Sequence, residues 1–332
     1  MTQRVFSTRR KLPGGGLARL ESQVDLVCWD GTGKPTPAEL AELAAGADGV
    51  LALGNDRIDA ELLDAAGESL RVVSLASMGF DAVDQQAAAD RGVVVTHTPG
   101  VLAETTADLA FALVLMARRR LASARDSLHA GEWSVFRMDD YLGLDVRGAT
   151  LGLVGYGQIG RAVARRATGF GMRVVHHAPF APEDDDLSTA TDFAALLAES
   201  DVISLHVPLT ESTRGLISTD ELRAMKRTAT LVNTSRGGVV DESALLAALR
   251  GGVIHSAGLD VFEREPRGED VADLVAESRL VALPHVGSAT EATRAAMVDL
   301  AVDNLLDVLS GGTARTPLPG TAAVPGSKGV TR

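Results

Sequence analysis

The sequence contains a single cysteine, Cys28, which lies in the apolar run VDLVCWD. One cysteine excludes a disulfide framework within the chain and any metal site built from several thiolates. A lone cysteine in an apolar run usually behaves as a small buried hydrophobe, so Cys28 is interpreted as a core residue. Because no HExxH motif and no carboxylate cluster at metal-binding spacing is present, we predict no catalytic metal.

Long apolar runs and basic blocks are also missing. No segment reaches the roughly 18 to 20 apolar residues that span a bilayer, and the basic start MTQRVFSTRRKLPGGG lacks the apolar part of a signal peptide. The formal net charge of -12 repels a phosphate backbone. We therefore expect a cytoplasmic protein that binds neither membranes nor nucleic acid.

What the sequence does have is two series of short apolar runs that alternate with Ala/Leu-rich amphipathic segments. The first series starts at residue 24 with VDLVCWD and ends near VVVTHTP; the second starts near Ala149 with ATLGLVG and ends at RLVALPH. A chain of 332 residues exceeds the length at which one hydrophobic core usually stops growing, so two domains are expected. Such alternation is typical of parallel sheets covered by helices, which makes the predicted fold class α/β.

The boundaries of the two domains follow from two helical patterns. One long helix is predicted from about Ala103 to His129, between the two series. The last helical pattern, ATRAAMVDLAVDNLLDVLSGG, has no sheet to cover in the second series, so we expect it to return to the first domain. The first domain then comprises residues 1–99 and 291–318, and the second is a continuous insertion, residues 100–290. The Pro/Gly-rich end, residues 319–332, is expected to be disordered.

A glycine motif opens the second series. Gly155, Gly157 and Gly160 form GxGxxG directly after the strand-like LGLV and before the helix-like RAVARRA. The first glycine permits a tight turn, the second lets the backbone approach a pyrophosphate, and the third lets helix and strand pack closely. Gln158 and Ile159 would offer backbone amides at the helix N-terminus. The motif predicts that the second domain binds a dinucleotide.

The residue at the position that commonly distinguishes NAD-binding from NADP-binding proteins is atypical in this chain. An acid that holds the ribose hydroxyls is expected at the end of the next strand, MRVVHHA, where this chain has Ala178. Loss of that carboxylate removes a group that repels a 2′-phosphate, yet no arginine follows in HAPFAPEDDD. The acidic run 183–186 is interpreted as a solvated loop, with one of its carboxylates as an alternative ribose partner. Both NAD and NADP stay open as the cofactor.

Several histidines receive structural interpretations. His176 and His177 are adjacent on a predicted strand and point to opposite faces, so they are not interpreted as a metal pair. His97 and His206 follow predicted strands beside the expected ligand cleft, where we expect core or supporting roles. His255 lies in the apolar segment VIHSAGLD and is interpreted as structural.

Three segments carry polar residues directly after an apolar strand, at the sheet edge where open α/β proteins bind ligands: NTSRGGVVDESAL, GLDVFEREP and LPHVGSAT. Reduction of a 2-oxo acid by a nicotinamide needs a group that holds the substrate carboxylate and a group that supplies a proton. Arg236 offers a fixed fork of donors suited to a carboxylate. His285 can deliver a proton near neutral pH, and Glu265 would orient it and favour its charged form.

These segments and the glycine motif together resemble the D-isomer-specific 2-hydroxyacid dehydrogenase family, from ELLDAAGESLRVVSLASMGFDAVD to LPHVGSATEATR. Within the family, TPGVLAETTADLAFALVL, the GEW segment at Gly131 and PHVGSATEATRAAM are most similar to glyoxylate and hydroxypyruvate reductases. The resemblance implies two Rossmann-like or flavodoxin-like parallel-sheet domains with an active-site cleft between them. It also implies a homodimer, in which the segment 103–147 packs against a second subunit.

The resemblance implies NAD(P)-dependent hydride transfer between nicotinamide and a small 2-oxo acid or D-2-hydroxy acid, with Arg236, Glu265 and His285 catalytic. The substrate carboxylate would also contact the backbone at Ser77, Met78 and Gly79. Motif and resemblance together predict the following cofactor contacts: Thr106, Gly155, Gly157, Gln158, Ile159, Gly160, Ala178, Val207, Pro208, Thr234, Asp260, His285 and Gly287. Two alternatives stay open, a nicotinamide-sensing protein similar to corepressors and a phosphite-type dehydrogenase of the same superfamily.

Overall fold

The computed structural model describes residues 2–31, 33, 35–179, 184–265 and 272–321. The chain divides into two compact units, which are unit 1 (Met1–Leu102 and Ala289–Arg332) and unit 2 (Ala103–Ser288). The predicted domain limits were residues 100 and 290. The observed division therefore lies close to the ends of the two sequence series, beside the start of the long helix and the start of the last helical pattern.

Unit 1 contains a five-stranded parallel sheet in the order β2-β1-β3-β4-β5. This is the strand order of flavodoxin-like sheets. Sequence analysis missed the interior strand β1, because its four residues, RVFS, give too short an apolar pattern to recognise. The strands are β1 (Arg4–Ser7), β2 (Asp25–Cys28), β3 (Gly49–Ala52), β4 (Val72–Leu75) and β5 (Val94–Thr96).

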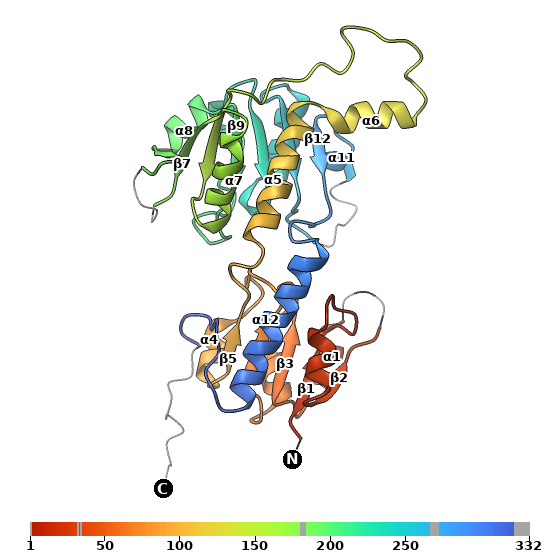
Figure 1. Ribbon diagram of the computed structural model, residues 1–332, viewed down its shortest axis with the longest axis vertical. Helices are drawn as coiled ribbons and strands as arrows, with labels where there is room; N and C mark the ends of the chain where they lie inside the picture. Colours follow the sequence, from red (N-terminus) through yellow and green to blue (C-terminus); the bar gives the residue numbers. More distant parts are fainter. Residues whose placement is uncertain (1, 32, 34, 180–183, 266–271, 322–332) are drawn as a thin grey trace. The chain divides into compact units, whose positions relative to one another are not determined.

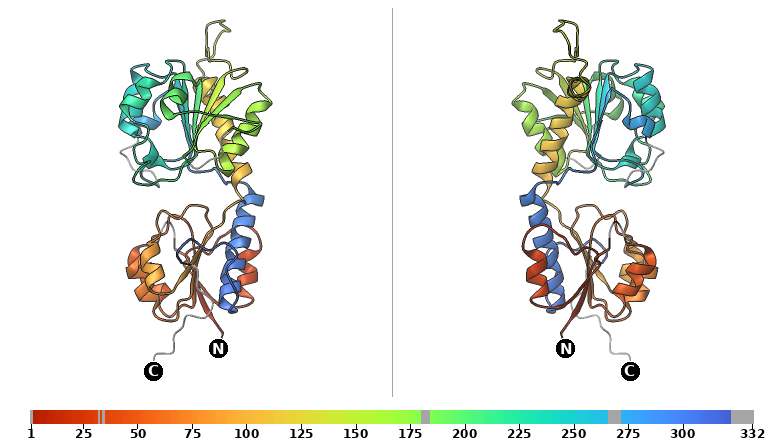
Figure 2. Two further views of the ribbon diagram at one scale, coloured as in Figure 1. Left: turned by 90° about the vertical axis from the view of Figure 1, so that its left-hand side faces the viewer. Right: turned by 90° about the vertical axis from the view of Figure 1, so that its right-hand side faces the viewer.

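Helices cover both faces of this sheet, as the edge-on views in Figure 2 show. One core contains side chains from α1 (Gly16–Glu21) and α12 (Glu291–Leu309), and α12 packs against β3 and β4. The other core lies under α2 (Pro37–Ala44), α3 (Ala60–Ala66) and α4 (Gln85–Asp90). The starts of these last helices are encoded locally, because Thr36, Asp59 and Asp84 each cap a free backbone N–H of the first turn.

The chain beyond α12 packs against β5. Leu318 is fully buried, and its backbone N–H donates to the Val95 carbonyl over 2.8 Å. Thr321 is also buried and exchanges hydrogen bonds with the backbone of Val95. The prediction of disorder from residue 319 was therefore wrong for residues 319–321, because a short polar segment can be ordered by a neighbouring strand edge. The rest of that prediction, residues 322–332, lies outside the described residues.

Unit 2 contains a seven-stranded parallel sheet in the order β12-β11-β10-β9-β6-β7-β8. Counted along the unit from β6, this is the doubly wound order of dinucleotide-binding folds, extended by one strand. The chain reverses its direction of strand addition between β6 and β9, which is where such folds bind ligands. The strands are β6 (Thr150–Val154), β7 (Arg173–His177), β8 (Thr189–Ala190), β9 (Val202–Leu205), β10 (Thr230–Asn233), β11 (Ser256–Leu259) and β12 (Leu280–Ala282).

Helices again cover both faces of the sheet. One core contains side chains of α5 (Ala103–Arg118) and α7 (Gln158–Thr168). The other contains side chains of α8 (Phe193–Glu199), α9 (Thr219–Ala224), α10 (Glu242–Arg250) and α11 (Ala272–Val275). A short 3-10 helix, η1 (Gly237–Val239), precedes α10.

The helix predicted from Ala103 to His129 is two helices. It breaks at Arg120, which has a left-handed backbone with φ 54°, and α6 (Leu121–His129) then extends away from the sheet (Figure 1). The buried Arg118 guanidinium donates to three backbone carbonyls and so fixes the end of α5. None of the α6 residues is buried. A helical pattern alone does not show where core packing stops.

No helix among the described residues is long and apolar enough to cross a membrane.

Candidate active site

The predicted site residues of unit 2 lie at the carboxyl ends of its parallel strands. Gly155 directly follows β6, and Val207 and Pro208 lie just beyond the end of β9. Thr234 directly follows β10, and Asp260 directly follows β11. Because the strands are parallel and in register, their carboxyl ends meet at one edge of the sheet.

The glycine turn between β6 and α7 has the geometry expected of a pyrophosphate site. Gly155 has φ +93°, and a Cβ there would lie 2.5 Å from the His206 carbonyl oxygen. A Cβ on Gly160 would lie 2.5 Å from the Gly155 carbonyl oxygen. A Cβ on Gly157 would meet no atom within 4 Å. The first and third glycines thus serve the fold, whereas the second leaves open space at the helix N-terminus, where the phosphates of a dinucleotide would bind.

Two further observations fit a dinucleotide. The Thr234 hydroxyl is buried and has no hydrogen-bond partner among the described residues, which is unusual for a polar atom and suits a group that binds there. Thr106, in the first turn of α5, is buried and its hydroxyl donates to the Gly287 carbonyl over 3.3 Å. The Thr234 hydroxyl is therefore available to a cofactor at this sheet edge, whereas the single hydroxyl proton of Thr106 is engaged by Gly287.

The loop after β7 differs from the sequence interpretation. Ala178 is partly buried and offers no polar group to a ribose. Asp185 is not simply solvated, because its carboxylate accepts hydrogen bonds from Tyr156, Arg161 and the Leu187 and Ser188 amides. Burial, followed by the contact with Asp185, raises the pKa of Tyr156 to about 12. The carboxylate is therefore engaged within the unit, and Glu183 lies outside the described residues.

Arg236 is presented by a tight turn after β10. The Asn233 side chain donates to the Arg236 carbonyl over 2.8 Å and accepts from the Ser235 amide over 3.0 Å. A Cβ on Gly237 would lie 1.8 Å from the Phe262 carbonyl carbon, so only glycine lets this turn approach the Phe262 backbone. The turn is thereby held against the segment that carries Glu265. Sequence analysis missed both Asn233 and Gly237, although the turn-forming NTSRGG pattern pointed to this loop.

Glu265 and His285 form a hydrogen-bonded pair, with 2.5 Å between a Glu265 carboxylate oxygen and Nδ1 of His285. The other Glu265 oxygen accepts from the Phe262 amide over 2.8 Å. The hydrogen bond that His285 donates to Glu265 raises the pKa of His285, against the opposing effect of burial. Burial opposes ionisation of Glu265, but its contacts with His285, the Phe262 amide and the charge of Arg236 together lower its pKa. The pair therefore favours an imidazolium beside a carboxylate.

Asp260 holds the loop that carries His285. Its buried carboxylate accepts from the Val286 and Gly287 amides, both over 2.8 Å, and its carbonyl accepts from the His285 amide over 2.9 Å. Burial raises the pKa of Asp260, and the two amides oppose that rise. His285 itself has φ 55°, a left-handed conformation that costs free energy in a non-glycine residue. The contacts of Asp260 maintain this conformation.

In unit 1, Ser77, Met78 and Gly79 follow β4 and are partly buried. A Cβ on Gly54, in the loop after β3, would lie 2.1 Å from the Ser77 hydroxyl oxygen, so Gly54 leaves room for this segment. The predicted substrate-binding backbone thus lies at the carboxyl edge of its own sheet.

The other histidines have protein partners. The His176 ring stacks on Tyr156 with 4.0 Å between ring centroids, and His177 contacts the Thr191 carbonyl. Nε2 of His206 lies 2.9 Å from the Ser204 hydroxyl, and burial lowers the pKa of His206 to about 4, so this ring is neutral. Among the described residues, no group of three or more His, Cys, Asp or Glu side chains could hold a metal ion.

Comparison with known proteins agrees with this geometry. The model of the D-isomer specific 2-hydroxyacid dehydrogenase NAD-binding domain matches residues 111–287. A glyoxylate reductase of Korarchaeum cryptofilum is 46% identical over 92% of both chains. The chain belongs to the D-isomer specific 2-hydroxyacid dehydrogenase family. As a member of this family, it is a nicotinamide-dependent oxidoreductase.

Two further relatives fall within the glyoxylate/hydroxypyruvate reductase group of this dehydrogenase family. A glyoxylate/hydroxypyruvate reductase B of Erwinia tasmaniensis is 42% identical over 91% of this chain and 94% of its own. An NADPH-dependent glyoxylate/hydroxypyruvate reductase of Sinorhizobium meliloti, solved with NADP and malonate, has a TM-score of 0.86 at 36% identity. That similarity covers 97% of this chain and 98% of the other. The family and subgroup predicted from the sequence are confirmed.

The open space at Gly157 leads to a testable prediction. Gly157→Ala should leave the fold unchanged but raise the Kd for NADH and NADPH about 10- to 100-fold, because the methyl group occupies the space in which amides approach a charged phosphate. Fluorescence titration of the reduced cofactor measures this. Gly15→Ala, where a Cβ also meets no atom within 4 Å, is the matched control and should change neither Kd nor Tm. Equal Kd values for the Gly157 variant and the wild type would contradict the phosphate site.

Proposed function

We propose that this chain reduces glyoxylate and hydroxypyruvate to the corresponding 2-hydroxy acids, with NADH or NADPH as the reductant. The carboxylate-backed imidazole of His285, at the sheet edge that also carries the glycine turn, is the main support for this proposal. The charge of Arg236 affects the pKa of both Glu265 and His285, which supports a role for the three as one group. The names of the curated relatives support the choice of substrates.

Each residue of the proposed site has its own role in the reduction of a 2-oxo acid. A bound reduced nicotinamide supplies hydride to the carbonyl carbon of the substrate. Because Nδ1 of His285 is engaged by Glu265, Nε2 is the nitrogen that gives a proton to the carbonyl oxygen. Arg236 binds the substrate carboxylate through charge-assisted hydrogen bonds, and the backbone at Met78 and Gly79 supplies further donors. In the reverse direction, neutral His285 accepts the proton from the hydroxyl group.

An assay of turnover and binding tests this function. Glyoxylate, hydroxypyruvate and pyruvate are each offered with NADH and with NADPH, and oxidation of the cofactor is followed by absorbance. Arg236→Ala should lower kcat/KM for the best substrate about 100-fold or more, since it removes a charged partner of the carboxylate, and should leave the cofactor Kd unchanged. Arg223→Ala, an exposed arginine on α9, is the control. Cofactor binding without turnover of any 2-oxo acid would favour the nicotinamide-sensing alternative.

The Glu265–His285 pair determines how the rate of reduction varies with pH. Reduction requires protonated His285, so kcat/KM should fall as pH rises through its pKa, which Glu265 raises. In Glu265→Gln the carboxylate charge is lost, and this alkaline fall should move to lower pH. Initial rates of glyoxylate reduction across pH measure the shift. An unmoved profile, or one moved to higher pH, would exclude Glu265 as the group that supports the charged imidazole.

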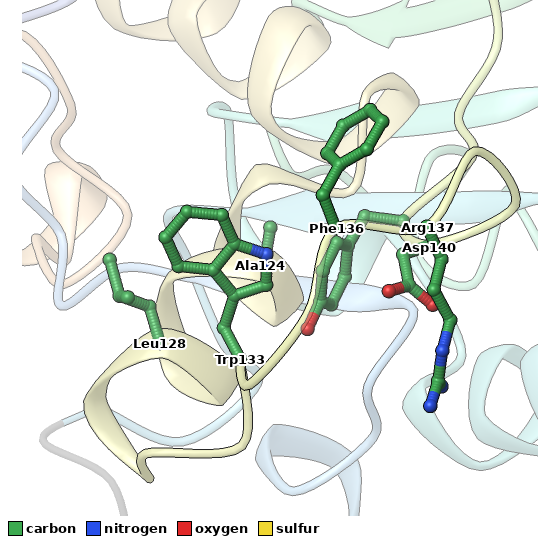
Figure 3. Close-up of a pocket in the computed structure, with 7 residues that line it drawn as sticks. Ala124, Leu128, Trp133, Phe136, Arg137 and Asp140 are labelled. Atoms are coloured by element: carbon green, nitrogen blue, oxygen red, sulfur yellow. The ribbon is translucent and has the colours of Figure 1, made fainter.

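We also propose that the protein is a homodimer, as the sequence resemblance implied. The segment formed by α6 and residues 130–142 exposes several large apolar side chains that no described part of the chain covers, notably Phe136 at 72% and Met138 at 82% exposure. Trp133, Leu128 and Tyr141 line a pocket of about 350 Å³ on the same segment (Figure 3). Exposed apolar surface of this extent marks an interaction site, and a second copy of the same segment provides a complementary surface.

Light scattering tests the dimer. The wild type should have the mass of two chains, and the double variant Phe136→Asp, Met138→Asp should have the mass of one, because two charges cannot be buried in an apolar interface. Arg223→Asp, on the exposed face of α9, should not change the mass. A monomeric wild type would contradict this proposal.

A further inference from the structure

The backbone that follows β4 in unit 1 is held from one side by the segment that follows β5. The Thr98 amide donates to the Ser77 carbonyl over 2.8 Å. Nδ1 of His97 lies 2.9 Å from the Met78 carbonyl oxygen, and since a carbonyl only accepts, Nδ1 carries the proton in this contact. Two successive carbonyl groups are therefore directed towards the same neighbouring segment.

These contacts also set the direction of two N–H groups. In a planar trans peptide, the carbonyl oxygen and the N–H of the next residue point in opposite directions. The contact at the Ser77 carbonyl therefore turns the Met78 N–H away from the segment after β5, and the contact at the Met78 carbonyl turns the Gly79 N–H away. Neither N–H donates to a protein acceptor among the described residues. Successive backbone N–H groups on one side form a concavity that favours an anion.

His97 is itself fixed in place by the segment that follows α12. The Thr316 hydroxyl donates to the His97 carbonyl over 2.5 Å, and the His97 amide donates to the Thr316 carbonyl over 3.2 Å. Fully buried Asn304, on α12, donates to the Thr316 hydroxyl over 2.8 Å. The imidazole also meets the Phe80 ring edge-on, with 5.5 Å between ring centroids. The backbone of His97 is thus held by Thr316, and its imidazole by the Met78 carbonyl and the Phe80 ring.

We infer that His97 is a positioning residue for the substrate carboxylate, acting through the peptide group between Met78 and Gly79. This inference rests on the proposed function and assigns His97 no contact with substrate. Without the donor at Nδ1, the Met78 carbonyl is released from the segment after β5 and the peptide group can rotate. Rotation would replace the Gly79 N–H, which attracts a carboxylate, by a carbonyl oxygen, which repels it.

Two substitutions test separately the hydrogen bond that His97 donates and the aromatic shape of its side chain. His97→Phe keeps an aromatic ring against Phe80 but has no donor for the Met78 carbonyl. His97→Asn loses the ring but places an amide N–H near the position of Nδ1. In the Phe variant, KM for glyoxylate should rise about tenfold or more, since a hydrogen bond to a charged group is weakened, while the Kd for the cofactor stays unchanged. The Asn variant should return KM to within about threefold of the wild type.

Steady-state kinetics on the full chain, with competitive inhibition by oxamate as a carboxylate probe, gives the decisive comparison. The inhibition constant of oxamate should rise in parallel with KM in the Phe variant, and kcat should change less than KM. If the Phe variant fails to fold by circular dichroism, His97→Ala, which lacks the donor and adds no volume, takes its place.

The outcomes are distinguishable. An active wild type whose Phe or Ala variant keeps the normal KM overturns the role of His97 and leaves the proposed function intact. An Asn variant as impaired as the Phe variant also overturns it, because the donor would then not be the property that matters. A wild type that turns over no 2-oxo acid overturns the proposed function and this inference with it.

Discussion

The parallel alignment of the strands governs how this protein assembles its site. Because every strand of the unit 2 sheet runs in the same direction, each loop that follows a strand emerges at the same edge. Residues as far apart in sequence as Gly155, Arg236 and His285 are thereby placed at that edge. The sheet brings these loops to one edge, and the loops carry the side chains that bind and react.

Close backbone approach is the second requirement, and glycine meets it in the segments around the site. Gly160 lets α7 approach the end of β6, and Gly155 lets the turn pass the His206 carbonyl. Gly237 lets the arginine turn lie directly against the backbone of Phe262. The pair formed by Glu265 and His285 depends on a similar fixed loop, in which Asp260 binds successive amides and maintains an unfavourable backbone conformation. The loops that carry the reactive side chains are therefore held in place by contacts of their backbone.

Unit 1 applies the same principle to its own sheet edge. The segment after β5 determines the direction of the peptide groups after β4, and the chain beyond α12 in turn holds the segment after β5. The segment that follows α12 is therefore part of the support of the proposed substrate-binding backbone, through contacts that join residues more than two hundred positions apart.

Much of this protein could be predicted from local sequence signals. The GxGxxG pattern with its flanking strand and helix predicted the turn at Gly155, and polar residues after apolar strands identified Arg236, Glu265 and His285 as candidates. The alternation of apolar runs predicted two α/β parts, because burial on both faces of a parallel sheet imposes that pattern. Four-residue β1 and the end of α5 at Arg118 were missed, because a short strand has almost no periodicity and a helical pattern continues past the point where packing ends.

The fold class, the family and the chemical types available to the site could be predicted before folding was considered, since these depend on residue identity and spacing along the chain. Several contacts that side chains make with distant segments became known only from the folded chain. Asp185 is bound by Tyr156 and Arg161, and His97 meets the Met78 carbonyl. These pairings join separate segments of the chain, and no local pattern encodes them, because they arise only when strands pair and bring distant segments to one edge.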